Sequence, residues 1–115
     1  MKTNEVLENI KARRSVRAYT GQQVLEEDLQ AILEAATYAP SGMHLETWHF
    51  TAIQNMDKLT ELNERIKGAF AKSDDSRLQE RGHSKTYCCY YHAPTLVIVS
   101  NELLNGGLVW IVLVP

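Results

Sequence analysis

Residues 93–99 read Ala-Pro-Thr-Leu-Val-Ile-Val, and this stretch decides how the chain can fold. Its apolar run is unbroken, which is typical of a strand that is covered on both faces. Upstream, residues 48–53 read Trp-His-Phe-Thr-Ala-Ile, and their aromatic and β-branched side chains predict a second strand. Residues 108–114 are apolar throughout, so a strand at that position needs a partner to cover it.

Helical spacing of apolar residues surrounds these predicted strands. Residues 4–14 and 25–36 carry apolar side chains every three or four positions, and Pro40 prevents the second helix from continuing. The same spacing returns over residues 55–70. Residues 72–85 are polar and charged, and they fit either a surface excursion or another short helix. The sequence alone does not decide between these two.

Composition indicates a folded domain without a nucleic-acid-binding surface. The chain has 115 residues, of which 44% are hydrophobic and 23% charged, the balance of a globular protein. A formal net charge of -2 offers no basic surface for nucleic acid. No repeat, low-complexity tract or linker divides the sequence, so we expect a single domain over residues 1–115.

Membrane insertion and disulfide bonding are not expected either. Residues 1–14 lack the apolar core of a secretory signal. The apolar run at 108–114 is far shorter than the roughly 20 residues that span a bilayer. Cys88 and Cys89 are adjacent in sequence, and neighbouring cysteines rarely form a disulfide because its geometry strains the backbone. We therefore expect a cytoplasmic protein.

A basic cluster follows the first predicted helix. It reads Arg13-Arg14-Ser15-Val16-Arg17. Three guanidiniums and a hydroxyl can surround a phosphate, because arginine offers forked and permanently charged donors. The alternative is a solvated basic helix end that complements the helix dipole.

A loop of small residues precedes the strand predicted at 48–53. Residues 39–47 read Ala-Pro-Ser-Gly-Met-His-Leu-Glu-Thr. Small residues let backbone groups approach a flat ligand closely, and His44 and Glu46 could contact its polar edge. The alternative is an ordinary connecting loop, followed by Trp48 and Phe50 as core residues of the strand.

Other arrangements of reactive residues do not form a known site. His83, Cys88, Cys89 and His92 are of the types that bind zinc, but their spacing lacks both a Cys-x-x-Cys and a His-x-x-x-His pair. We therefore expect no metal. No glycine-rich phosphate loop follows a strand, and no nucleophile and base are arranged by their spacing.

The order of these motifs resembles the FMN-dependent nitroreductase family. Arg-Arg-Ser-Val-Arg, then Ala-Pro-Ser-Gly, Trp-His-Phe and His-Ala-Pro-Thr-Leu-Val-Ile-Val follow one another at family spacing, and the resemblance covers residues 3–104. It implies an α+β fold, with a mixed central sheet flanked by helices, and a homodimer that holds FMN at its interface. It also implies an oxidoreductase that passes hydride from NAD(P)H through the flavin to nitroaromatics, quinones or similar small acceptors.

The resemblance assigns cofactor-binding residues by position and no catalytic residue. Arg13, Arg14, Ser15 and Arg17 match the contacts to the FMN phosphate and ribityl chain. The loop residues approach the isoalloxazine, and Ser41 is expected to act across the dimer; this loop group comprises Pro40, Ser41, Gly42, Met43, His44 and Glu46.

The sequence departs from the family pattern in the second half of that loop. His44 stands where the family has Asn, Glu46 where it has Gln, and Thr47 where it has Pro. A glutamine amide both donates and accepts, whereas an ionised carboxylate only accepts. We expect the charge of Glu46 to disfavour the anionic reduced flavin.

Family members are longer than this sequence, and the resemblance fades after Asn105. From the resemblance we therefore expect a partial domain, incomplete at its C-terminus. This leaves a second interpretation open beside the enzyme. It is a catalytically inactive truncated remnant, or an interaction module that binds flavin or another anion.

Overall fold

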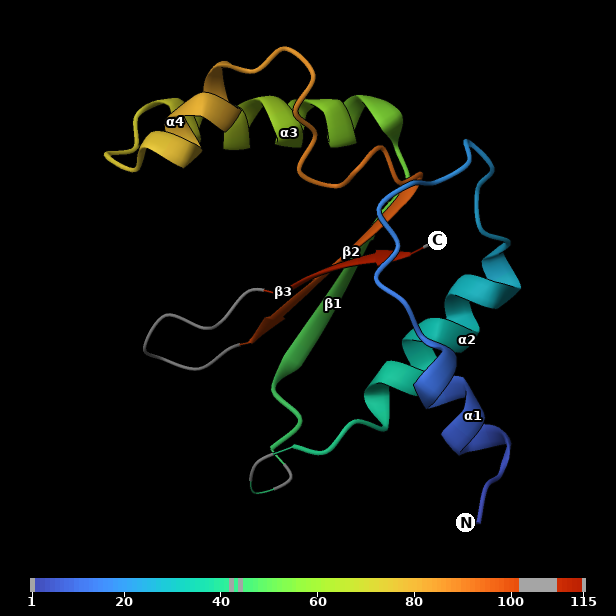
Figure 1. The fold of residues 1–115 in the computed structure, drawn as a ribbon. Helices are drawn as coiled ribbons and strands as arrows, with labels where there is room; N and C mark the ends of the chain where they lie inside the picture. The colour runs from blue at the N-terminus through green and yellow to red at the C-terminus, as the bar shows by residue number, and fades with distance from the viewer. Residues whose placement is uncertain (1, 42, 44, 102–109, 115) are drawn as a thin grey trace.

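A computed structural model describes residues 2–41, 43, 45–101 and 110–114 of the chain. Within these residues four helices and three strands follow one another (Figure 1): α1 (Glu5–Ala12), α2 (Glu26–Thr37), β1 (Trp48–Ile53), α3 (Met56–Ala71), α4 (Ser76–His83), β2 (Thr95–Asn101) and β3 (Trp110–Val114). The predicted α+β class is confirmed. The polar stretch 72–85, which the sequence left open, contains the short helix α4.

The strands form a sheet in the order β1-β2-β3, with both pairings antiparallel. Trp48 lies opposite Asn101 and Ile53 opposite Leu96, so the predicted strand at 48–53 pairs along its whole length. The apolar run near the end of the sequence supplies β3, whose backbone pairs with β2 from Thr95 to Val99. On this edge the backbone of the run is therefore paired with β2, whereas the expected cover for its apolar side chains stays a prediction.

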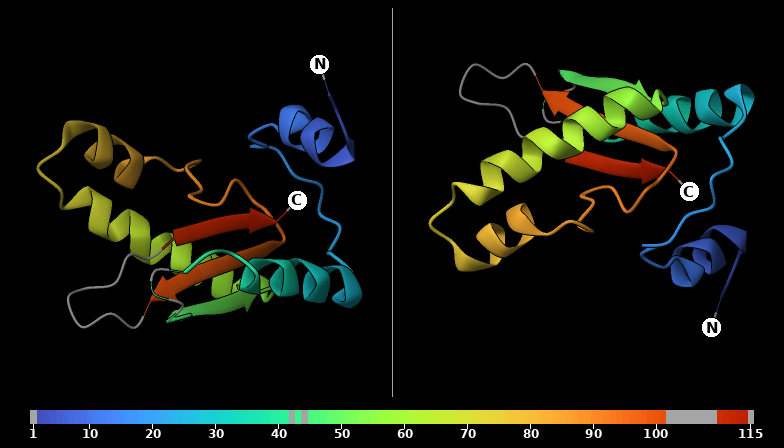
Figure 2. Two further views of the ribbon diagram at one scale, coloured as in Figure 1. Left: turned by 90° about the horizontal axis from the view of Figure 1, so that it is seen from below. Right: turned by 90° about the horizontal axis from the view of Figure 1, so that it is seen from above.

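Strand β2 is covered on both faces, as its unbroken apolar run predicted. Leu96 and Ile98 pack with Leu59 of α3 on one face. Val97 and Val99 pack with Leu29 of α2 on the other face. This alternation follows from the strand geometry, in which successive side chains point to opposite faces. Figure 2 accordingly shows α2 and α3 on opposite sides of the sheet.

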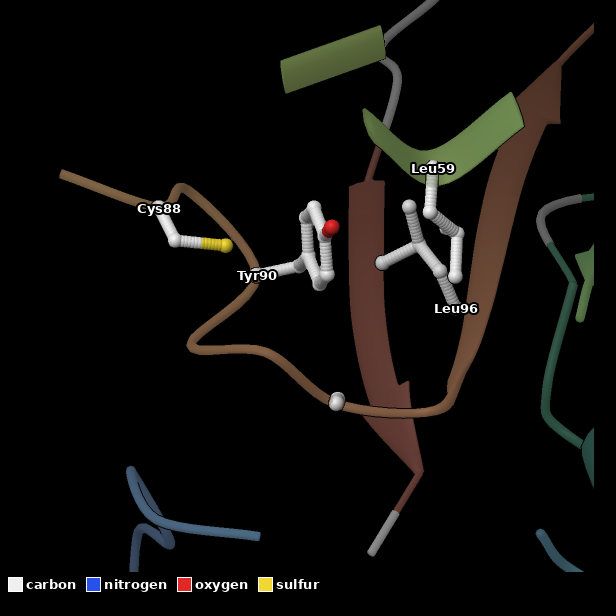
Figure 3. Packing of buried hydrophobic residues seen from close by; sticks show 5 residues of the cluster. Leu59, Cys88, Tyr90 and Leu96 are labelled. Atoms are coloured by element: carbon white, nitrogen blue, oxygen red, sulfur yellow. The ribbon is translucent and has the colours of Figure 1, made fainter. Parts of the chain in front are cut away.

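The core on the α3 side is closed by the segment that leads into β2. Leu59 and Leu96 are fully buried, and Figure 3 shows the Tyr90 ring directed toward them. Cys88 and Ala93 complete this cluster. We call this group, Leu59, Cys88, Tyr90, Ala93 and Leu96, the α3-side core.

A buried amide fixes that segment to α3. The Asn63 side chain donates through Nδ2 to the Tyr87 carbonyl at 3.1 Å and accepts the Cys89 N–H through Oδ1 at 2.9 Å. An amide can satisfy both backbone groups at once because it carries a donor and an acceptor. Further along, Tyr91 and His92 have φ values of 52° and 57°, so the chain turns through two left-handed residues before β2.

Side-chain caps determine where three of the helices begin. Asn4 accepts from the Leu7 N–H, and Asn55 accepts from the Lys58 N–H. Asp75 accepts from the Arg77 N–H at the start of α4, and this hydrogen bond lowers the pKa of the Asp75 carboxyl. Each cap satisfies a backbone donor that has no partner within the helix.

Helix α1 stands apart from the rest of the fold. None of its residues is buried, and Val6 and Ile10 are 66% and 65% exposed. It overlaps α2 in Figure 1, but the views of Figure 2 separate the two helices. The apolar side of α1 is therefore not covered by the described part of this chain.

Helices α3 and α4 contact each other closely at a glycine. A Cβ placed on Gly82 would meet the Ala71 backbone nitrogen, and it would lie 2.7 Å from both the Ala71 Cα and the Lys67 carbonyl oxygen. Gly68 has nothing within 4 Å of the same position. The two glycines thus form a matched pair, one in a crowded helix contact and one in open space.

We predict that Gly82→Ala destabilises the chain, because backbone atoms cannot yield as a flexible side chain would. The expected loss is about 1–3 kcal/mol, the range for overpacked cores. Gly68→Ala should instead stabilise by roughly 0.5–1 kcal/mol, since alanine is the better helix former. Urea unfolding of both variants measures the difference. Equal effects of the two substitutions would contradict the close α3–α4 contact.

Candidate functional site

The basic segment leaves the C-terminal end of α1 in an extended conformation. Arg13 is the C-cap, with φ −56° and ψ 137°, so the helix stops there. The Arg14 guanidinium donates through Nη1 to the carbonyls of Lys11 at 3.0 Å and Arg13 at 2.9 Å. Arg14 therefore complements the negative end of the helix dipole, which is the alternative that the sequence left open for this cluster.

The other polar side chains of the segment have no comparable hydrogen-bond partner among the described residues. Arg13, Ser15 and Arg17 are exposed. Among the described residues, none of the three makes a side-chain hydrogen bond or an ion pair. Two guanidiniums and a hydroxyl are thus left to bind an anion. No described carboxylate neutralises them.

A tyrosine that the sequence analysis did not single out fixes this segment to the fold. The Tyr19 ring packs against the α3-side core. Its hydroxyl donates to the Val16 carbonyl at 2.9 Å, between Ser15 and Arg17. The basic segment is therefore linked to the sheet through one aromatic side chain.

A polar network fixes the chain a few residues further on. Gln23 donates through Nε2 to the carbonyls of Pro94 at 2.8 Å and Gln54 at 3.3 Å. The Thr95 hydroxyl, fully buried, donates to Gln23 Oε1 at 2.9 Å and accepts from the Gln54 amide at 2.9 Å. These bonds join the segment before α2 to the end of β1 and the start of β2.

The loop between α2 and β1 is held by a bond within itself. The Glu46 N–H donates to Ser41 Oγ at 2.9 Å. Met43 and Glu46 have φ values of 53° and 48°, in the left-handed region that non-glycine residues seldom adopt. Gly42 and His44, which the family resemblance places at the flavin, lie outside the described residues.

This loop borders an open hollow. The hollow has a volume of about 490 Å³ and is lined by Thr37, Tyr38, Ala39, Pro40, Ser41 and Glu46. Met43 is 91% exposed, so its side chain does not pack on the fold. Small residues and an exposed backbone leave room for a flat molecule at this end of α2.

The basic segment and the loop do not meet within one chain. Figures 1 and 2 show the segment after α1 apart from the loop that precedes β1. The hydrogen bonds of each segment are local: Arg14 and Tyr19 bond within residues 11–19, and the Glu46 N–H bonds to Ser41. The two candidate segments therefore lie apart within one chain.

Cys88, Cys89 and His92 lie in and next to the turn before β2, whereas His83 is the last residue of α4. Cys88 Sγ accepts the His92 N–H at 3.3 Å, and burial raises the pKa of the Cys89 thiol. In the described part of the chain, no three His, Cys, Asp or Glu side chains gather as a metal site would require. No described helix combines the length and apolarity needed to cross a membrane.

Comparison with known proteins shows the family of this chain. The family model of the nitroreductase family matches residues 10–109. The chain belongs to the nitroreductase family. A nitroreductase-family relative from Methanothermobacter thermautotrophicus, whose name includes NADH dehydrogenase and NAD(P)H nitroreductase, is 42% identical over 60 residues. The match covers 52% of this chain and 31% of the relative.

Solved nitroreductase structures share the fold. A Bacteroides fragilis nitroreductase with bound FMN is 79% identical, with a TM-score of 0.85 over 87% of this chain and 54% of its own. A nitroreductase from Desulfitobacterium hafniense with bound FMN is 31% identical, with a TM-score of 0.73 over 88% of this chain and 54% of its own. The chain spans about half the length of these two structures.

We predict that Ser41→Ala opens the loop between α2 and β1. The substitution removes the acceptor of the Glu46 N–H, and a hydrogen bond contributes about 1 kcal/mol, so exchange of that amide should rise about fivefold. Ser15→Ala is the matched control, because Ser15 makes no side-chain bond in the described structure. Amide hydrogen exchange followed by NMR measures both variants. An unchanged exchange rate of the Glu46 amide in Ser41→Ala would contradict the role of Ser41.

Proposed function

We propose that this nitroreductase-family chain binds FMN and belongs to an FMN-dependent oxidoreductase. One observation carries the proposal: Arg13, Ser15 and Arg17 are exposed and lack side-chain partners among the described residues. A relative that is 79% identical over most of this chain was solved with FMN. The relative supports this observation, because exposed arginines alone also occur at ordinary helix ends.

The chemistry of the basic segment fits the FMN phosphate. A phosphate dianion needs several donors and positive charge, and two guanidiniums with a hydroxyl provide both. Arg14 holds the carbonyl end of α1, which would otherwise repel an anion. In this proposal Arg13, Ser15 and Arg17 hold the phosphate and ribityl chain, while Arg14 mainly supports the segment.

The loop before β1 is proposed to approach the isoalloxazine of the partner copy. Its separation from the basic segment within one chain supports a site completed by a second copy, in which Pro40, Ser41, Gly42, Met43, His44 and Glu46 border the ring. The uncovered side of α1, with Val6 and Ile10 exposed, supports burial against such a partner. A homodimer satisfies both requirements.

The chemistry of turnover then belongs to the cofactor. When bound, the flavin would supply the redox chemistry that connects NAD(P)H as hydride donor with a nitroaromatic, a quinone or a similar small acceptor. The chain's own residues bind the phosphate, orient the ring and set its electrostatic surroundings. No side chain is assigned as an acid, base or nucleophile.

Phosphate recognition gives the sharpest test of the proposed function. We predict that Arg13→Ala and Arg17→Ala each weaken FMN binding about tenfold, since hydrogen bonds to charged groups contribute about 1.5–3 kcal/mol. Riboflavin, which lacks the phosphate, should bind these variants as it binds the unsubstituted chain. Titration by flavin fluorescence measures the affinities of both flavins for the two variants and for the unsubstituted chain.

The matched control for these variants is Arg65→Ala. Arg65 is an exposed arginine of α3 that pairs with Glu61 at 3.0 Å, away from the basic segment. Its removal should leave both flavin affinities unchanged. An FMN affinity that falls equally in Arg65→Ala, or that stays unchanged in Arg13→Ala and Arg17→Ala, would contradict the proposal. Flavin binding without NAD(P)H consumption would favour the inactive binding module over the enzyme.

The charge of Glu46 yields a prediction about flavin tuning. In this proposal its carboxylate lies near the flavin and disfavours the anionic reduced form. Glu46→Gln should raise the flavin midpoint potential by on the order of tens of millivolts, as expected for removing one nearby charge. Glu27→Gln, on the exposed side of α2, is the control. Potentiometric titration that finds the same potential in both variants would contradict this tuning.

A further inference from the structure

Residues 14–24 depend on few contacts for their position. In the described structure, no backbone-to-backbone hydrogen bond joins residues 14–24 to the sheet or to a helix. Gln23 anchors its far end through the network with Gln54 and Thr95. Among the described residues between Arg14 and Gln23, Tyr19 is the one whose side chain both packs against the core and makes a hydrogen bond, which it donates to the Val16 carbonyl.

The two parts of the Tyr19 side chain have different tasks. Its ring packs against the α3-side core and so shares the position of α3 and β2. Its hydroxyl fixes the carbonyl of Val16, which lies between the two residues whose side chains face a phosphate in the proposed site. The Val16 carbonyl belongs to the planar peptide group between Val16 and Arg17, so fixing it restricts Arg17 directly and Ser15 through the Val16 backbone.

We infer that Tyr19 is a positioning residue for phosphate recognition, which rests on the proposed FMN site. Its hydroxyl holds Ser15 and Arg17 ready before the ligand arrives. Ordering a segment in advance improves affinity because less freedom is lost on binding. The effect falls on the phosphate end of the ligand, since the basic segment does not meet the loop proposed to contact the ring.

The test separates the hydroxyl from the ring. Tyr19→Phe keeps the ring in the core and removes the bond to Val16. Tyr91→Phe is the matched control, because the Tyr91 side chain makes no hydrogen bond among the described residues. Loss of one hydrogen bond predicts that the preference for FMN over riboflavin falls about fivefold in Tyr19→Phe. The riboflavin affinity and the thermal midpoint should stay close to those of the control.

A second measurement needs no flavin. Trypsin cleaves after arginine. A segment that has lost the Tyr19–Val16 hydrogen bond enters the trypsin active site more readily than one that keeps it. Cleavage after Arg17 should be several-fold faster in Tyr19→Phe than in the unsubstituted chain, because the lost hydrogen bond contributes about 1 kcal/mol. Cleavage after Arg65 in the same chain serves as the internal reference. Mass spectrometry of the timed digest identifies each site.

Each outcome decides the inference. A lower FMN preference together with faster cleavage after Arg17 supports it. Equal weakening of FMN and riboflavin binding overturns it, and so does an unchanged FMN preference or an unchanged cleavage rate. Each of these results leaves the proposed FMN site standing. An unsubstituted chain that does not prefer FMN over riboflavin overturns the proposed function, and with it this inference, even if cleavage is faster.

Discussion

The structure depends on the burial of β2 between two cores. Its side chains alternate, so that Leu96 and Ile98 meet α3 while Val97 and Val99 meet α2. Each buried aliphatic side chain contributes about 1.5–3 kcal/mol when removed from water. Neither helix needs to contact the other, because both are positioned through the same strand. The neighbouring strands β1 and β3 satisfy the backbone of β2 on its two edges.

The two candidate segments owe their positions to this arrangement. The basic segment is attached through Tyr19 to the α3-side core and through Gln23 to Pro94 and Gln54. The loop with Ser41 is held between the end of α2 and the start of β1, on a different part of the molecule. The fold thus places the two candidate segments on different parts of the molecule, and the proposed site shared between two copies is argued from this separation.

Local patterns were sufficient to predict β1, β2 and the long helices, because burial and periodicity are visible in neighbouring residues. They were insufficient for residues 72–85, since the cap that starts α4 lies at Asp75 within a polar run with little apolar spacing. The role of Arg14 at the α1 carbonyls could be named only as an alternative. Tyr19, Gln23 and Asn63 were missed, because their hydrogen bonds or packing join segments that are distant in sequence, and no local pattern marks them.

The central claim is that this fold presents a binding site for FMN. The most direct measurement is the visible spectrum of the chain after incubation with FMN and removal of free flavin by gel filtration. The account predicts that flavin absorption bands travel with the protein peak. A protein peak that is folded by circular dichroism, yet carries no flavin absorption, would contradict it.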